Sequence, residues 1–412
     1  MNSRTTCAAC GGGNIHAFYR VDDIPVHSCL MLDSREAALA FPRQNLELGF
    51  CTDCGFVQNV LFDPTAHRYS IDYEETQIFS PRFQRFVAEI CDDQDRKYSL
   101  AGKTALEIGC GKGEFLVALC ERTGCAGIGI DPGYRPERTN SPAAARLNFV
   151  QDFYGPKYQH LAADYVCCRH TLEHIHEVLE FMRLVRSAIG DRPEVPVFFE
   201  LPDMERVLRE GAFWDIYYEH CSCFTLGSLA RLFRRTGFDV TDLWKAYDDQ
   251  YLMIEARPVA GPTEPTLPAE DDLAGITELV AAFEVDIRTR LAKLREQATG
   301  WSSAGRKVAI WGSGSKAVSY LTTLGLRDEI AAVVDINPHK HGKFLAGTGH
   351  EIVGPQALVA LRPDVVLVMN AIYTAEIRED LLRLGLRPEI SALAGGLQAL
   401  RAVACAPVLA RS

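Results

Sequence analysis

The stretch "KTALEIGCGKGEFLVALCE", residues 103–121, constrains the fold of this 412-residue chain more than any other. A short apolar segment ends in Glu107, glycines follow at alternate positions, and a segment with helical spacing begins near Glu114. Glycines let the backbone of such a turn approach a ligand at the carboxyl end of a parallel strand. The stretch therefore predicts the first strand, turn and helix of an α/β domain with a ligand site.

The apolar segments that follow end in residues suited to a nucleoside. "CAGIGID" ends in Asp131, at the separation of about 20 residues expected for a carboxylate that accepts from ribose hydroxyls. "LNFVQDFYG" and "ADYVCCRHTLEHI" are predicted as the third and fourth strands. A dinucleotide site favours G-x-G-x-x-G, but Glu114 occupies the third spacing here, where its carboxylate would repel a diphosphate.

The E-x-G-x-G-x-G form of this turn resembles motif I of class I S-adenosylmethionine (SAM)-dependent methyltransferases. SAM carries a cationic sulfonium and no phosphate, which suits an acidic site. The resemblance implies that the adenine meets Asp152 through its amino group and Phe153 through its ring. The expected cofactor residues are Glu107, Gly109, Gly111, Gly113, Asp131, Asp152, Phe153 and His170.

The segment "RHTLEHIHE", residues 169–177, follows the fourth strand and is rich in histidine. If it were helical from Thr171, His170 and His174 would lie on one face, a spacing typical of metal ligands. That motif also needs a third ligand and a helix in a cleft. The favoured interpretation of Glu173 and His174 is therefore structural: they shape the cofactor pocket and cap the helix.

Two C-x-x-C-G knuckles, "CAACGGG" and "CTDCGFVQ", predict a metal site near the N-terminus. Four thiolates at such turns surround Zn²⁺ tetrahedrally at about 2.3 Å, and a set without an open position implies a structural metal. A redox dithiol is the alternative, but it would stand at a helix start after a strand. The long interval between the knuckles predicts an inserted sub-domain. The ligands are Cys7, Cys10, Cys51 and Cys54.

Charge and composition limit the partners. The formal net charge is −11, which makes nucleic acid a poor first expectation. No apolar stretch approaches the roughly 18 uncharged residues of a membrane span, and no signal peptide is evident. The remaining ten of the 14 cysteines lie largely in apolar runs, as free thiols in a reducing compartment do. We expect a cytoplasmic protein with a small-molecule substrate, as a monomer or homodimer.

The stretch "IYYEHCSCFT", residues 216–225, follows the predicted fifth strand, at the edge of the sheet where ligands bind. Together, the C-x-x-C pair, motif I, L-E-H and Y-x-E-H resemble the three-domain SAM-dependent C-methyltransferases that act on nucleotide-linked keto-deoxysugars. The resemblance covers nearly the whole chain. It implies that His220 removes a proton next to a ketone, with Tyr217 and Glu219 beside it, and that Tyr69 and Tyr73 contact the substrate.

Two positions depart from that family. The chain has "YSIDYEETQ" where the sugar enzymes tend to have Tyr-x-Tyr-x-Ser-Ser, and Cys223 where they often place an aromatic residue. Both fall where the substrate would be held.

A second strand, glycine turn and helix is predicted at "RKVAIWGSGSKAVSYL", residues 306–321, with Asp335 about 20 residues on. Alone it would predict a nicotinamide site. The corresponding domain of the resembled family binds no redox cofactor and forms part of the substrate cleft, so substrate binding is favoured over a purely structural role and over NAD. The expected substrate residues here are Ser313, Ser315, Lys316 and Asn370.

The predicted organisation has three parts and a connection. Residues 1–68 form the zinc module, 69–256 the class I methyltransferase domain with a lid, 257–300 a linker and long helix, and 301–412 a Rossmann-like substrate domain, with the active site between the last two. The predicted reaction is methylation of a carbon next to a ketone. An O- or N-methyltransferase of another metabolite is the alternative, and a zinc-ribbon nucleic-acid modifier is a third hypothesis.

Overall fold

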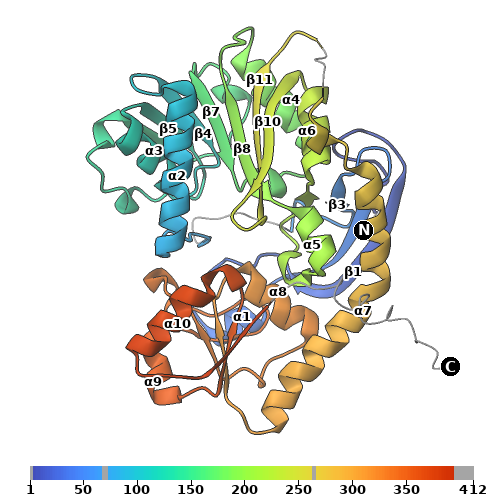
Figure 1. The fold of residues 1–412 in the computed structure, drawn as a ribbon, viewed down its shortest axis with the longest axis vertical. Helices are drawn as coiled ribbons and strands as arrows, with labels where there is room; N and C mark the ends of the chain where they lie inside the picture. Colours follow the sequence, from blue (N-terminus) through green and yellow to red (C-terminus); the bar gives the residue numbers. More distant parts are fainter. Residues whose placement is uncertain (1–2, 67–72, 262–265, 394–412) are drawn as a thin grey trace, which may run out of the picture.

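The computed structural model describes residues 3–66, 73–261 and 266–393. Two α/β units lie one above the other in Figure 1, joined along one side by a long helix. A small N-terminal sheet packs beside this helix at the level between the two units.

The upper unit is built on a seven-stranded sheet of order β10-β11-β8-β7-β4-β5-β6. β4, β5, β6, β7 and β8 are parallel, and β11 is antiparallel to both of its neighbours. The strands are β4 (Thr104–Ile108), β5 (Ala126–Ile130), β6 (Leu147–Val150), β7 (Tyr165–Arg169), β8 (Val197–Pro202), β10 (Phe238–Ala246) and β11 (Tyr251–Pro258). The strands predicted around the first glycine turn are confirmed in type and order.

Helices cover both faces of this sheet (Figure 1). On one face lie α2 (Pro81–Tyr98) and α3 (Glu114–Thr123), and on the other α4 (Val178–Ile189) and α6 (Leu226–Arg235). α2 begins where Ser80 accepts from the Phe83 N–H, with proline in the first turn. It buries Phe83, Val87 and Ile90, the apolar face that its spacing predicts.

The lower unit has a parallel sheet of order β14-β13-β12-β15-β16. Its strands are β12 (Val308–Trp311), β13 (Ala332–Val334), β14 (Ile352–Val353), β15 (Val365–Val368) and β16 (Glu389–Ala392). Its helices are α8 (Ser315–Leu324), α9 (Leu358–Leu361) and α10 (Thr374–Arg383). The second strand, glycine turn and helix is confirmed as β12 and α8.

The N-terminal sheet contains a strand from the middle of the chain. It consists of β1 (Ile15–Pro25), β2 (Arg43–Cys51) and β3 (Val57–Asn59), with the short helix α1 (Arg35–Leu39) between β1 and β2. Its fourth strand is β9 (Ser222–Cys223), which pairs with β3. The sheet therefore crosses the boundary predicted at residue 68 and joins the N-terminal region to the segment around His220.

The long helix α7 (Leu273–Ser303) connects the two units, as its apolar spacing predicts. It buries Ile276, Val280, Phe283 and Ile287 in one core cluster shared with the N-terminal sheet and with α8. The short helix α5 (Met204–Glu210) follows β8 and packs on α7. None of the helices in the described part of the chain is long and apolar enough to cross a membrane.

The helix considered from Thr171, which would have placed His170 and His174 on one face, does not form. Residues 170–177 form a single 3-10 turn at Leu172–His174, and α4 starts only at Val178, with Glu177 at its N-cap. His170 has φ +48, which an α-helix does not allow. His170 and His174 therefore do not share a helical face, and Glu173 caps no helix.

Candidate active site

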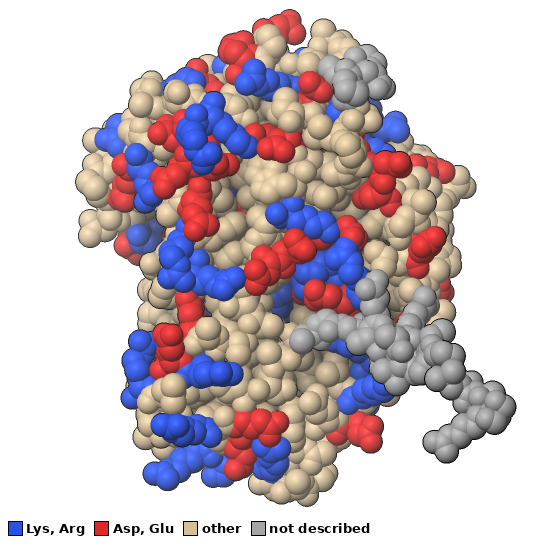
Figure 2. All heavy atoms as spheres, in the orientation of Figure 1, with Lys and Arg blue, Asp and Glu red and all other residues tan. Residues whose placement is uncertain are grey.

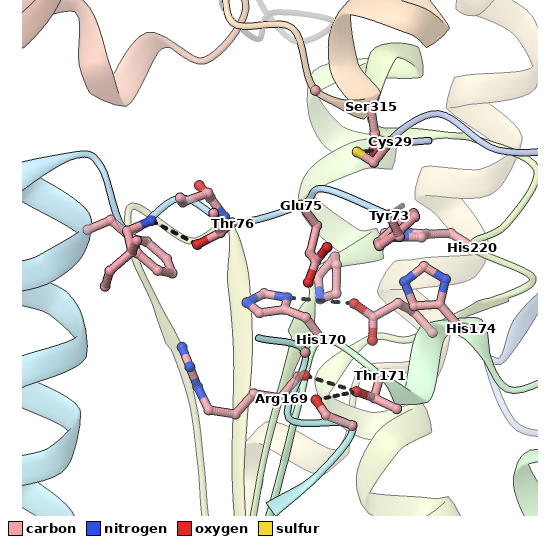
Figure 3. Close-up of a pocket in the computed structure, with 18 of the residues that line it drawn as sticks. Cys29, Tyr73, Glu75, Thr76, Arg169, His170, Thr171, His174, His220 and Ser315 are labelled. Atoms are coloured by element: carbon pink, nitrogen blue, oxygen red, sulfur yellow. Dashed lines mark hydrogen bonds and ion pairs between the residues drawn. The ribbon is translucent and has the colours of Figure 1, made fainter. Parts of the chain in front are cut away.

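A cavity of about 710 Å³ lies between the two α/β units. Its lining includes the first glycine turn around Gly111 and the second around Gly314, with Tyr217 and His220 in the wall. Figure 3 shows how side chains from these separate segments converge on it. The predicted position of the active site, between the second and third parts, coincides with this cavity.

The first glycine turn has no room for side chains. Gly109 has φ +72, and a Cβ there would lie 2.0 Å from the Thr171 hydroxyl oxygen. Gly113 has φ +83, and a Cβ there would lie 2.7 Å from the Phe149 ring. Asp131 fixes the turn by accepting from the Gly111 N–H at 3.0 Å. The backbone thus forms a cradle at the end of β4, open to the cavity.

Glu107 lies beneath this cradle and is 2% exposed. Its Oε2 has no hydrogen-bond partner, and burial raises its pKa to about 8. An unpaired buried carboxylate is costly unless a ligand supplies a donor or a positive charge. SAM carries two cationic groups and a ribose, so the open cradle and the unpaired acid fit this cofactor.

The two residues predicted to hold adenine have different positions. Phe153 lines the cavity and is 63% exposed, so its ring is available to a ligand. Asp152 is not in the lining. It accepts from the Tyr158 hydroxyl at 2.5 Å and pairs with Lys157, which turns its carboxylate to its own loop. Its predicted contact with the adenine amino group stays a prediction.

His170 lines the cavity but is held by buried acids. A ring nitrogen lies 2.9 Å from Glu200, which also accepts from Arg169 at 2.6 Å. Burial opposes protonation, but Glu200 and Glu173 outweigh it and raise the pKa of His170 to about 9. The imidazolium is therefore a fixed positive charge at the end of β7. Its predicted cofactor contact stays a prediction.

Tyr217 and His220 stand at the two ends of a tight turn. The His220 N–H donates to the Tyr217 carbonyl at 3.2 Å, and the two rings lie 4.2 Å apart at 66°. Both side chains line the cavity, and burial raises the pKa of Tyr217 well above its usual value. The turn places an imidazole and a protonated phenol beside each other, an arrangement suited to proton removal next to an oxyanion.

His174 completes this group, although sequence reasoning assigned it a structural role. Its Nδ1 lies 3.1 Å from the Glu219 carbonyl, and its ring lies 4.8 Å from that of His220 at 89°. A carbonyl only accepts, so Nδ1 carries the proton and Nε2 is basic in the neutral ring. Figure 3 shows His174 and His220 in the same wall, with Tyr73 above them.

Glu219 points away from the base that it was expected to orient. It is 0% exposed, and its Oε1 accepts from the Ser28 N–H at 2.8 Å and from the Ser28 hydroxyl. Ser28 lies 2.7 Å from Ser315 at the start of α8. Burial raises the pKa of Glu219 to about 7. Through Ser28, the Glu219 side chain connects this turn to the lower unit, and the Glu219 backbone carbonyl accepts a hydrogen bond from His174.

One group in the cavity wall has the composition of a metal site. Ligand atoms of Glu173, His174 and His220 all lie within 4.8 Å of one another. Glu173 Oε2 is buried without a hydrogen-bond partner. The group can act as a proton relay or can hold a divalent cation with open positions.

Of the two tyrosines predicted to contact the substrate, Tyr73 lines the cavity, 6.2 Å from the His174 ring. Tyr69 lies outside the described residues. The segment that begins at Tyr73, residues 73–80, runs along the cavity wall from a bridge with Leu30 to the N-cap of α2 and is called the strap below. Its Glu75 also lines the cavity and was missed, because nothing in the sequence relates it to the glycine turn.

The wall formed by the lower unit differs in part from the prediction. Ser313 is fully buried and is not in the lining; its N–H and hydroxyl donate to Asp335 at 2.9 and 2.6 Å. The carboxylate that would hold an NAD ribose therefore holds its own turn. Ser315 and Lys316 line the cavity, with Lys316 paired to Asp215.

Asn370 also lines the cavity, but its amide is paired. It donates to Gln250 at 2.9 Å and accepts from the same side chain at 3.1 Å. The pair spans the two α/β units, with Gln250 just before β11 begins and Asn370 just after β15. Asn370 therefore connects the units, and its predicted contact with substrate stays a prediction.

The four cysteines of the two knuckles meet at one point. All four sulfur atoms lie within 4.8 Å of one another, and the Cys7–Cys54 and Cys10–Cys51 sulfur pairs are 3.6 Å apart. Tetrahedral zinc places its sulfur ligands about 3.8 Å apart. The arrangement fits zinc.

Two parts of the chain match known protein families. Residues 80–243 match the methyltransferase domain family, and residues 264–385 match the C-methyltransferase C-terminal domain family. The C-methyltransferase NovU of Streptomyces niveus is 28% identical over 295 residues, which are 68% of this chain and 69% of that protein.

These matches identify the chain as a SAM-dependent methyltransferase with a C-methyltransferase C-terminal domain.

Solved structures are similar to part of this C-methyltransferase. Magnesium protoporphyrin IX methyltransferase of Synechocystis with bound SAM is 15% identical, with a TM-score of 0.33, over 43% of this chain and 79% of that one. An N1-methyltransferase of 1,6-didemethyltoxoflavin from Burkholderia thailandensis is 17% identical, with a TM-score of 0.31, over 42% and 77%.

Proposed function

We propose that this C-methyltransferase methylates an enolisable carbon next to a ketone, in a nucleotide-linked keto-sugar, with His220 as the base. The observation that carries the proposal is the position of His220. It lies in the wall of one cavity that has the cofactor cradle on one side and the start of α8 on the other. A substrate in the cavity would meet both the base and the methyl donor.

The base is a histidine in a polar cluster of rings. His220 contacts His174 and Tyr217 by their edges, and histidine titrates near neutral pH. A proton next to a ketone becomes acidic when the developing charge spreads to oxygen. The Tyr217 phenol, which stays protonated, is a suitable donor to that oxygen, worth roughly 3 kcal/mol.

The reaction needs a methyl donor and an acceptor carbon. SAM supplies an electrophilic methyl group on a cationic sulfur. His220 holds the proton taken from carbon, and Glu107, Asp131 and the glycine turn hold the cofactor. The strap and the ring cluster then keep water away from the carbanion.

The acceptor class follows from the lower wall. Ser315 stands at the start of α8, and Lys316 and Lys340 line the same wall. A helix N-terminus with nearby cations favours an anion such as the diphosphate of a nucleotide sugar. A nicotinamide cofactor is disfavoured here because Asp335 accepts from both the N–H and the hydroxyl of Ser313 and also lies 3.5 Å from the Lys340 ammonium.

Zinc is proposed as a structural ion held by the four cysteines. Cys54 is followed by β3, and β3 pairs with β9 beside His220. The ion would therefore support the segment that holds the base. We also propose a cytoplasmic location. The 13 cysteines in the described part of the chain form no disulfide, as is usual for proteins of a reducing compartment.

The test is exchange of the substrate proton. A panel of nucleotide keto-sugars is incubated in deuterium oxide with the enzyme and S-adenosylhomocysteine (SAH). We expect deuterium at one carbon with the wild type and at least a hundredfold slower exchange with His220→Gln, whose SAM affinity should be unchanged. With SAM, mass spectrometry should show a new C-methyl group.

Methylation of oxygen or nitrogen, or unimpaired exchange by His220→Gln, would contradict the proposal. Loss of exchange with a chelator that leaves the four-cysteine zinc bound would instead assign Glu173, His174 and His220 to a catalytic metal.

A further inference from the structure

The strap carries an acid into the cofactor side of the cavity. Glu75 Oε1 lies so close to the glycine turn that a Cβ on Gly111 would be 2.9 Å from it. Glu75 Oε2 is shielded from solvent and has no hydrogen-bond partner. In Figure 3 the side chain extends from the strap toward His170, into the space above the cradle.

The neighbours of Glu75 fix the strap on both sides. Glu74 accepts from Arg138, beyond β5, at 2.9 Å and from Asn337 of the lower unit at 2.9 Å. Gln77 donates to Tyr251 at 3.0 Å and accepts from Tyr373 at 2.8 Å. Since the strap is held on both sides of Glu75, by Glu74 before it and Gln77 after it, the fold directs Glu75 into the cavity.

The cavity lining already contains one acid with an unpaired oxygen, Glu107, at the end of β4 next to the turn. Lys112 does not neutralise either of them by contact, because its ammonium donates to the Gly133 carbonyl at 2.9 Å. Two carboxyl oxygens in the lining of the cavity, Glu75 Oε2 and Glu107 Oε2, therefore lack a donor. Such an arrangement favours a cationic ligand.

We propose that Glu75 is a cofactor-binding residue that recognises the positive charge of the SAM sulfonium and thereby favours SAM over SAH. SAH has the same adenosine and amino acid but a neutral sulfur. Methyl transfer removes the positive charge from sulfur, so the product loses its attraction to Glu75 and its release is aided. The raised pKa of Glu75, about 7 because of burial, agrees with an acid that lacks its counter-charge.

The experiment measures binding by calorimetry, with no turnover involved. The ligands are SAM, SAH and sinefungin, a SAM analogue with an amine in place of the sulfonium methyl. The variants are Glu75→Gln, which keeps the shape, Glu75→Asp, which keeps the charge, and Glu74→Gln as a matched control in the strap.

We expect Glu75→Gln to weaken SAM and sinefungin about tenfold or more and SAH by about threefold or less. Glu75→Asp should retain part of the preference for SAM. Glu74→Gln should change all three affinities by the same factor. Equal losses for SAM and SAH in Glu75→Gln, or no change for any ligand, would overturn the proposal. The ratio of the SAM and SAH affinities, taken within one variant, is independent of its folded fraction.

Discussion

At the scale of the residue, the site depends on which atom of each side chain is engaged. His174 has its Nδ1–H on the Glu219 carbonyl, and its ring lies 4.8 Å from that of His220. Glu219 has its carboxyl on Ser28, away from both rings. The Y-x-E-H motif therefore supplies a base and a phenol on one side of a turn and a support for the lower unit on the other.

His174 offers a test of positioning. His174→Asn keeps an N–H donor for the Glu219 carbonyl, whereas His174→Leu removes it. We expect His174→Leu to lower kcat about tenfold to a hundredfold with little change in SAM affinity, because the turn that holds His220 loses a hydrogen bond. His174→Asn should recover part of kcat. Equal losses in the two variants would show that the imidazole itself, and not the Nδ1 hydrogen bond, is required.

Three buried acids predict how stability depends on pH. Burial raises the pKa values of Glu75 to about 7, Glu107 to about 8 and Glu219 to about 7. Above a pH of about 4.5 the unfolded chain releases these protons first, so stability falls as pH rises through the folded pKa values.

We expect the melting temperature of the ligand-free protein to fall between pH 5 and pH 8. Sinefungin should reduce this slope, and Glu75→Gln should make it shallower without ligand. A melting temperature that rises steadily over this range would contradict the raised pKa values of these three buried acids.

At the scale of the element, the two-residue strand β9 connects the segment that carries His220 to the N-terminal sheet. Cys223 pairs with Val57 and Ser222 with Gln58, so two residues tie the turn at Tyr217–His220 to the sheet beside the four cysteines. Phe56 and Phe224, both fully buried, pack here with their ring centroids 4.9 Å apart and their planes tilted by 53°. The departure at Cys223 thus falls in a strand of the N-terminal sheet, with its thiol 3.6 Å from the His220 carbonyl.

Removal of zinc tests this connection. We expect a chelator, or Cys54→Ser, to lower kcat about tenfold or more while SAM affinity changes by about twofold or less. The reason is that the zinc module supports β9, whereas the cradle stands on β4 and β5. Calorimetry with SAM and metal analysis, run beside turnover, provide the measurement. A parallel loss of SAM binding would mean that the zinc module supports the whole upper unit.

At the scale of the whole molecule, the cavity exists because two α/β units face each other across polar contacts. Figure 2 shows acidic and basic side chains interspersed over one face, including the level between the units. Tyr247 donates to Tyr373 at 2.7 Å, and Ser80 donates to Glu376 at 2.8 Å. Polar interfaces of this kind allow domains to move relative to each other more readily than apolar ones do.

The amide pair of Gln250 and Asn370 can be tested by a double-mutant cycle. If Asn370 serves to connect the units, Gln250→Ala and Asn370→Ala should raise KM equally, by about threefold, and the double variant should be no worse than either. If Asn370 binds the substrate, Asn370→Ala should raise KM more than Gln250→Ala does. Steady-state kinetics on the three variants separates these outcomes.

Local patterns were sufficient for much of the fold. The two glycine turns, the strands and helices next to them, the apolar face of α2 and the length of α7 all follow from the spacing of glycine and apolar residues. These features depend on near neighbours in the chain, whose geometry is set by backbone sterics and helix periodicity. The cysteine knuckles belong to the same class.

The sequence by itself thus determined the two α/β units, the cofactor cradle, the four-cysteine cluster and the position of His220 at the edge of a sheet. Only the tertiary structure decided that His174 faces His220, that Glu219 binds Ser28, that Asp152 and Ser313 turn away, and that Glu75 enters the cradle. Each of these depends on residues far apart in the chain. Which donor a carboxylate or imidazole finds is set by packing between units, and no local periodicity encodes it.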